Sequence, residues 1–205
     1  MSEPVNMQMV IVVVIAILQI TQVAHANADN KHGTASTSKR LMRELQGFYE
    51  SGSYKNGIFA IELVNDDIYE WNVKVFKFDP DSKLQKSLLR MKEEGNEDAH
   101  VMFHIKFPDN YPFSPPFMRV AHPHIYGGFV LTGGAICMEI LSEQHWSSAY
   151  TVELLIMQIT SVMAQSGDIV PISDDAVPYS YRNAKLKFDA LVKYHGWGSK
   201  DRESG

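Results

Sequence analysis

The spacing of apolar residues in the first half of the chain predicts two helices. Apolar side chains recur every three or four positions over 41–49, behind hydroxyl side chains at 36–38 that can cap a helix start, and the pattern ends at Gly52. This predicts an amphipathic first helix. A shorter pattern over 83–94 favours a short helix, and a long insertion between two strands is the alternative.

Two further helical patterns lie in the C-terminal part of the chain. Apolar residues over 152–163 form one face of a long helix that ends near Gly167, and this helix is expected to back a sheet. A last pattern over 180–194 predicts a final helix, which Gly196 closes. The stretch 167–178 between them has no such period and is predicted to be irregular.

Alternating apolar and polar residues predict strands in the middle of the chain. The clearest alternation runs over 101–107, and other strand patterns cover 58–64, 69–78 and 117–121, with a turn at 79–82. Strands in this succession suggest a meander. We therefore expect an α+β domain in which a four-stranded antiparallel meander sheet is backed by helices.

The composition limits the classes of protein to which the chain can belong. With 205 residues, of which 45% are hydrophobic, the chain can bury one substantial core and fits a single globular domain with extensions. The formal net charge of −5 disfavours a phosphate-binding surface, because such surfaces carry an excess of Lys and Arg. We expect no nucleic-acid partner.

The chain has one cysteine, Cys137. One cysteine cannot form an intramolecular disulfide and gives no support for a thiolate zinc site, so no bound metal is expected and a reducing compartment fits best. The cysteine follows two glycines at 133–134, and glycine allows tight turns and the close approach of a second molecule. We interpret Cys137 as an accessible thiol that can accept an acyl group from a thioester and pass it to an amine.

Two other interpretations of Cys137 stay open. On composition alone, a free cysteine is more often a small hydrophobic side chain in a core. The other is a Cys–His hydrolase, in which a histidine activates the thiol as the general base. The candidate bases are His122, His124 and His145.

The N-terminal segment also allows several interpretations. Val10–Leu18 is an uninterrupted apolar run, and Ala24–Ala26 is typical of a cleavage site, so 1–26 can be a secretory signal, although no Lys or Arg precedes the run. The run is short for a membrane span, and the basic residues after it would keep the rest of a tethered chain cytosolic. A disordered apolar tail or a gene-model extension is the remaining alternative.

Four motifs follow one another in the second half of the chain. They are Tyr111-Pro-Phe-x-Pro-Pro, His122-Pro, Gly133-Gly-Ala-Ile-Cys-Met-Glu and Trp146-Ser-Ser-Ala-Tyr-Thr-Val-Glu. In this order they resemble the motifs of the ubiquitin-conjugating enzymes, and the last two are most similar to the Q-type branch. The resemblance runs from about Lys39 to the C-terminus.

The resemblance implies a fold and a division of the chain. The fold is expected to be UBC-like, with the four-stranded antiparallel meander, an N-terminal helix and C-terminal helices. An apolar N-terminal segment with a flexible linker would occupy 1–37, the ubiquitin-conjugating core domain 38–198, and a frayed tail 199–205.

The resemblance also implies an activity. The enzyme would accept ubiquitin from the ubiquitin-activating enzyme as a thioester on Cys137 and transfer it to a lysine of a substrate protein, usually with a ubiquitin ligase. The activating enzyme would consume ATP, and this chain would bind no cofactor. The expected location is the cytoplasm, the nucleus or both, with a membrane-tethered or a secreted protein as alternatives.

Two sets of charged residues receive roles from the resemblance. Lys39, Arg40 and Arg43 fall largely off the apolar face of the first helix and would dock on the activating enzyme; an ordinary solvated face is the alternative. Asp174 and Asp175 lie in a stretch that resembles the family's gate over the active site.

A ligase would dock on a second surface. Prolines around Phe113 fix backbone torsions and remove donors, so a stiff loop can hold this aromatic side chain at the surface. By resemblance, Phe113 would bind the ligase together with the turn of Ser147, Ser148 and Ala149. The alternative places Phe113 in the edge of the domain.

One position departs from the family pattern. The common family motif is His-Pro-Asn, and this chain has His124 in the position of the asparagine. The donor for the oxyanion is therefore unassigned, with His122, His124, His145 or backbone N–H groups as candidates. The departure also suggests an alternative function, a ubiquitin-binding adaptor of the same fold without catalysis.

Overall fold

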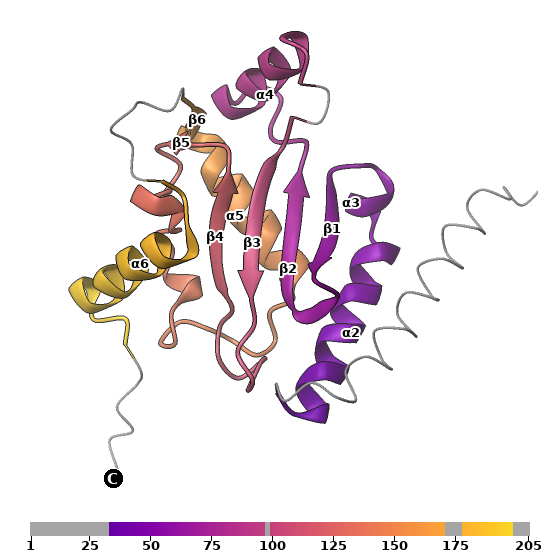
Figure 1. Ribbon diagram of the computed structural model, residues 1–205, viewed down its shortest axis with the longest axis vertical. Coiled ribbons are helices and arrows are strands. Elements are labelled where there is room, and N and C mark those ends of the chain that lie inside the picture. Colours follow the sequence, from indigo (N-terminus) through magenta and orange to yellow (C-terminus); the bar gives the residue numbers. More distant parts are fainter. Residues whose placement is uncertain (1–32, 97–98, 171–177, 199–205) are drawn as a thin grey trace, which may run out of the picture.

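The computed structural model describes residues 33–96, 99–170 and 178–198, and a four-stranded antiparallel sheet lies at its centre (Figure 1). The strands follow the chain in the order β1-β2-β3-β4, which confirms the predicted meander. Strand β2 begins and ends earlier than the predicted 69–78. The strands are β1 (Phe59–Val64), β2 (Asp67–Val75), β3 (Val101–Lys106) and β4 (Phe117–His122).

Helices cover the ends and one face of this sheet. In Figure 1, α5 passes behind the sheet, α2 lies beside β1, and α6 lies on the side of β4. The shorter α4 confirms the helix predicted over 83–94. The helices are α2 (Ala35–Glu50), α3 (Gly52–Lys55), α4 (Lys83–Glu93), α5 (Val152–Ser166) and α6 (Tyr181–His195).

The first helix begins earlier than its sequence pattern predicts. Thr34 has an extended backbone, and its Oγ1 accepts a hydrogen bond from Thr37 N at 3.1 Å, so Thr34 and not a hydroxyl at 36–38 is the N-cap. Thr37 is instead buried and donates its Oγ1 proton to the carbonyl oxygen of Asp109 at 2.9 Å. A contact 72 residues away in the chain thus decides the role of this hydroxyl.

The core lies between the sheet and helices α2 and α5. Along β2, Trp71, Val73 and Val75 are buried and alternate with partly exposed polar residues, as a sheet with one covered face requires. Each large side chain buried in this way contributes roughly 1.5–3 kcal/mol. The helices supply the opposing side chains, among them Leu41, Leu45, Phe48, Leu155, Ile156 and Ile159.

A second, two-stranded sheet lies above the end of β4. It pairs β5 (Ile125–Tyr126) with β6 (Asp168–Ile169). The prediction that 167–178 is irregular was therefore wrong for the first residues of that stretch, which form β6. Local patterns do not reveal this pairing, because the two strands are far apart in sequence. Among the helices of the described residues, none has the length and apolarity needed to cross a bilayer.

Several predictions fall on residues outside the described ranges. These are the apolar run and linker over 1–32, the gate aspartates Asp174 and Asp175, and the tail at 199–205. Each of them stays a prediction. The predicted gate nevertheless lies between two described elements, because β6 precedes it and α6 follows it in the chain.

Candidate active site and docking surface

Cys137 lies at the end of a loop that folds back on itself. The backbone N–H of Cys137 donates a hydrogen bond to the carbonyl oxygen of Phe129 at 2.8 Å, and Leu131 N donates to Ala135 O at 2.7 Å. Ala135 also forms an isolated bridge with Arg119 of β4. We call residues 124–137 the active-site loop. Its own backbone and the edge of the main sheet fix the position of the cysteine.

The two glycines before Cys137 lie where a side chain would clash with other parts of the domain. Gly133 and Gly134 have φ angles of +83° and +91°. A Cβ atom at 133 would lie 2.8 Å from Asn183 Cβ of α6, and one at 134 would lie 2.2 Å from Val120 O of β4. The predicted turn is confirmed, and the close approach that we expected from a second molecule is made by α6 and β4.

The thiol of Cys137 is partly exposed, as a thiol that reacts with another protein must be. Burial raises the pKa of Cys137 above its ordinary value. Of the candidate bases, His145 pairs with Ser142, and His124 Nε2 has no hydrogen-bond partner among the described residues. A Cys–His hydrolase needs a histidine base and a depressed thiol pKa, whereas burial shifts the pKa of Cys137 the other way.

The three candidate histidines have different surroundings. His145 Nδ1 pairs with Ser142 Oγ at 3.0 Å, outside the active-site loop. Burial, followed by the proximity of His100 and His124, lowers the pKa of His122. His124 Nε2 is buried and has no hydrogen-bond partner among the described residues. Among the three, His124 is thus the one with a buried ring nitrogen that is unpaired within the described residues.

Sequence reasoning missed one residue that packs on the active-site loop, Tyr179. Its ring stacks on His124 with 3.9 Å between centroids and 29° between ring planes. Its hydroxyl accepts a hydrogen bond from Ile125 N at 3.2 Å and lies 3.3 Å from Ile125 O, to which it donates. The only local signal is an aromatic residue just before the N-cap Ser180, which does not point to the loop.

The predicted ligase surface comes together in the structure. Phe113 is 75% exposed, so the alternative in which it packs into the domain edge is not observed. Trp146 Nε1 donates to Pro112 O at 2.7 Å and so joins the proline-rich loop to the following turn. Ser148 and Ala149 of this turn are exposed, and Ser147 is half-buried. Binding of a ligase here stays a prediction.

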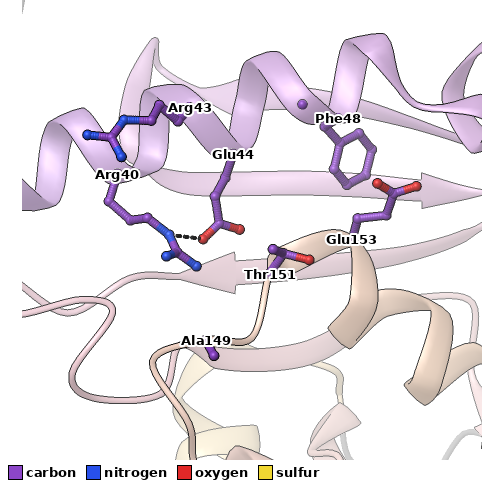
Figure 2. A pocket seen from close by; sticks show the side chains of 8 residues that line it. Arg40, Arg43, Glu44, Phe48, Ala149, Thr151 and Glu153 are labelled. Atoms are coloured by element: carbon purple, nitrogen blue, oxygen red, sulfur yellow. Dashed lines mark hydrogen bonds and ion pairs between the residues drawn. The ribbon is translucent and has the colours of Figure 1, made fainter.

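The three basic residues predicted on α2 differ in their surroundings. Lys39 and Arg43 are exposed, whereas Arg40 is held within the molecule. Arg40 Nε donates to Glu44 Oε1 at 2.6 Å, shown dashed in Figure 2, and Arg40 Nη2 donates to Tyr150 O at 2.8 Å. Burial lowers the pKa of Arg40, but Glu44 and Tyr111 together outweigh that effect and the pKa is raised.

Glu44 is a second residue that sequence reasoning missed. Besides Arg40, its carboxylate accepts hydrogen bonds from Tyr111 OH and from Val152 N, both at 2.6 Å. Burial and the charge of Glu44 raise the pKa of Tyr111, so its hydroxyl stays a donor. An Arg four residues from a Glu on a helix was the available signal. We use the name docking end for three neighbouring segments. They are Lys39–Phe48 of α2, the proline-rich loop at 111–116 and the Trp146 turn at 146–149.

A cavity of about 310 Å³ lies in the docking end. Figure 2 shows it between α2 and the start of α5, with Arg43 and Phe48 on the helix and Thr151 and Glu153 opposite. Within the described ranges, no group of three histidine, cysteine, aspartate or glutamate residues has the arrangement of a metal site.

Comparison with known proteins agrees with this geometry. The family model described as ubiquitin-conjugating enzyme matches residues 40–195. The human and mouse proteins named ubiquitin-conjugating enzyme E2 Q1 are 43% identical over 176 residues, which is 84% of this chain and 42% of each relative. A human Q-like ubiquitin-conjugating enzyme is 40% identical over 161 residues, covering 76% of this chain and 95% of that relative.

A solved structure supports the fold. The crystal structure of a ubiquitin-conjugating enzyme E2 from Plasmodium falciparum is similar with a TM-score of 0.52 and 20% identity, covering 66% of this chain and 90% of that one. At this identity the similarity concerns the fold alone. The chain spans about two fifths of the length of the E2 Q1 relatives that it matches.

Proposed function

Because the chain belongs to the ubiquitin-conjugating enzyme family, in its Q-type branch, we propose that Cys137 carries ubiquitin as a thioester. The ubiquitin would come from the activating enzyme and leave to a lysine of a substrate protein, usually with a ligase. The observation that carries the proposal is a single, partly exposed cysteine at the end of a loop fixed by its own backbone.

Besides this thiol, the transfer reaction needs only a few groups from the protein. A thioester reacts with an amine more readily than an amide does, so transfer needs a held acyl group, donors near the developing oxyanion and an acceptor for the amine proton. ATP is consumed by the activating enzyme in this scheme, and no cofactor binds to this chain. Cytoplasm and nucleus are the compartments that fit a reduced thiol.

The docking end would bind the two partner enzymes. We assign contact with the activating enzyme to Lys39 and Arg43, because both are exposed on one helix. Arg40 would support this surface from behind, since its guanidinium is bound to Glu44 and to Tyr150 O. Phe113 and the adjoining turn would bind the ligase.

Ligase docking can be tested with Phe113→Ala. Because the side chain is 75% exposed, its loss changes the free energy of unfolding by less than about 0.5 kcal/mol. The variant should charge with ubiquitin as the wild type does and lose the acceleration of discharge by a ligase. Tyr194→Ala is the matched control, because Tyr194 is 84% exposed on α6. Full ligase stimulation of Phe113→Ala would contradict the assignment.

The carrier role is tested by a single-turnover charging assay. The full chain is mixed with ubiquitin, activating enzyme and Mg-ATP and run on a non-reducing gel, for wild type and Cys137→Ala. A ubiquitin-sized shift that disappears with a thiol reductant and with Cys137→Ala is the expected result. A folded wild-type protein that shows no shift would contradict it and favour the adaptor, for which ubiquitin binding without transfer is the next measurement.

A further inference from the structure

Tyr179 contacts both ends of the active-site loop. Its phenol pairs with the backbone N–H and C=O of Ile125, the first residue of β5. At the other end of the loop, a Cβ atom at position 134 would lie 3.2 Å from Tyr179 Cδ2, so the ring packs directly on Gly134. One side chain therefore links the start of the loop to a point three residues before Cys137.

The same ring holds His124 from one face. With 3.9 Å between centroids and 29° between ring planes, the contact is a close stack, a geometry worth a factor of about two to ten in an equilibrium. The backbone carbonyl of His124 also accepts from Val170 N at 3.2 Å. Both the ring and the main chain of His124 are thus held in place.

The polar end of His124 is not satisfied inside the protein. Its Nε2 is buried without a hydrogen-bond partner among the described residues. Leaving a buried nitrogen unpaired costs free energy, and such atoms in native structures call for a specific explanation. A role for this nitrogen in the transfer step would provide one.

We propose that Tyr179 is a positioning residue for the transfer step, acting through His124 and through the two ends of the active-site loop. In this step the amine nitrogen of a lysine forms a bond to the thioester carbonyl carbon and the carbon–sulfur bond breaks. Cys137 leaves as a thiolate and is protonated by the equivalent of the proton that the amine gives up. The inference rests on the proposed function.

Tyr179 can take this part because its hydroxyl stays protonated. Burial is the main effect on the phenol and raises the pKa of Tyr179, so the group can donate to one backbone atom and accept from another at neutral pH. The residue also directly precedes Ser180, whose Oγ accepts from Asn183 N at 3.1 Å and caps α6. The start of α6 therefore fixes where Tyr179 lies.

The test separates charging from discharge in the full chain. Wild type and variants are charged with ubiquitin, the activating enzyme is stopped, free lysine is added, and loss of the thioester is followed on non-reducing gels. Tyr179→Leu removes the stack and both hydrogen bonds, and should discharge about tenfold or more slowly while charging within about twofold of wild type. Tyr179→Phe keeps the stack and should discharge about two- to threefold more slowly.

A matched variant and a spectroscopic signal control for general damage. Tyr181→Leu makes the same chemical change two residues away, where the ring packs on Phe117 at 5.2 Å, and should leave discharge unchanged. In NMR spectra, the ring protons of His124 should show a ring-current shift that Tyr179→Phe keeps and Tyr179→Leu loses. Tyr179→Leu should slow discharge less in a His124→Phe background than in wild type, because only the part of its effect that acts through the histidine is lost there.

The outcomes separate this inference from the proposed function. If wild type forms no thioester, the proposed function is wrong. If wild type charges but Tyr179→Leu discharges at the wild-type rate, or Tyr181→Leu slows discharge as much, only the positioning role is wrong. If Tyr179→Leu does not fold, Tyr179→Phe decides, and discharge at the wild-type rate by that variant overturns the proposal.

Discussion

At the docking end, one carboxylate gathers three segments of the chain, whereas packing contacts and neutral hydrogen bonds hold the active-site loop. Glu44 binds Arg40 on its own helix, Tyr111 in the proline-rich loop and Val152 at the start of α5. The active-site loop relies on glycine contacts with α5, α6 and β4 and on the stack of His124 with Tyr179.

The difference follows from what each region does in the proposed function. A docking surface must keep its shape while other proteins bind and leave, and charge-assisted hydrogen bonds give it direction as well as strength. A site of transfer must leave polar atoms for the reacting groups. Packing can fix such a loop without occupying its donors and acceptors, as His124 Nε2, unpaired among the described residues, illustrates.

Gly134→Ala should have the largest effect, because it breaks the packing of the active-site loop. Its φ angle is +91°, and the added Cβ would lie 2.2 Å from Val120 O. We expect the free energy of unfolding to fall by roughly 2–5 kcal/mol, measured by urea denaturation, together with slower charging.

Gly57→Ala is the control for that experiment. Its φ angle is also positive, at +60°, but no atom of the described residues lies within 4 Å of the added Cβ. Only the backbone strain remains there, so we expect a loss of about 1–2 kcal/mol. Equal losses for the two variants would contradict close packing at Gly134.

Glu44→Ala should break the docking end in a different way. It leaves Arg40, Tyr111 and Val152 without their shared acceptor. The free energy of unfolding, measured by urea denaturation, should therefore fall by about 2–3 kcal/mol. Glu153→Ala, a change in the same cavity, should cost less than about 1 kcal/mol. If the two losses are alike, Glu44 is not the centre of this region.

The rate at which the Cys137 thiol is alkylated should depend on pH, and this tests the difference between the charged docking end and the active-site loop. Because burial raises its pKa, the thiolate is the minor form at neutral pH and its fraction rises about tenfold per pH unit. Alkylation by iodoacetamide should therefore speed up about tenfold from pH 7 to pH 8, followed by mass spectrometry. A rate that is already level over this range would show a depressed pKa and a nearby activating cation.

Gly47→Ala should have the smallest effect and the opposite sign. Gly47 lies inside α2 at the docking end, and, apart from its chain neighbours and the nearby helix backbone, no atom of the described residues lies within 4 Å of an added Cβ. Alanine is the better helix former, so thermal and urea unfolding should show a gain of about 0.5–1 kcal/mol. A loss of stability would mean that α2 is closely packed at this point.

The secondary structure that depends on short-range patterns could be predicted from the sequence. The alternation along β3 and the apolar spacing of α5 identify those elements because one face of each is buried. The pairing of β5 with β6 could not be predicted, because it joins residues that are far apart in the chain. The cap at Thr34 is a local contact with Thr37, but the burial of Thr37 against Asp109 is not visible in the local pattern of hydroxyl residues.

The candidate site shows the same division. Cys137 and Phe113 stand in motifs, so sequence reasoning finds them, and the structure places one partly and the other largely exposed. Glu44 and Tyr179 carry no motif, and their importance lies in which segments they join. Arg40 shows that a basic residue on a polar helix face can be bound within the molecule, which spacing alone does not indicate.

The most direct test of the central claim is the intact mass of the charged protein, with Cys137→Ser beside wild type. Wild type should gain the mass of one ubiquitin less one water through a bond that a thiol reductant cleaves. Cys137→Ser should either stay uncharged or gain the same mass through an ester that resists the reductant. A reductant-resistant adduct on wild type, or a thiol-sensitive adduct that persists in Cys137→Ser, would contradict a ubiquitin thioester on Cys137.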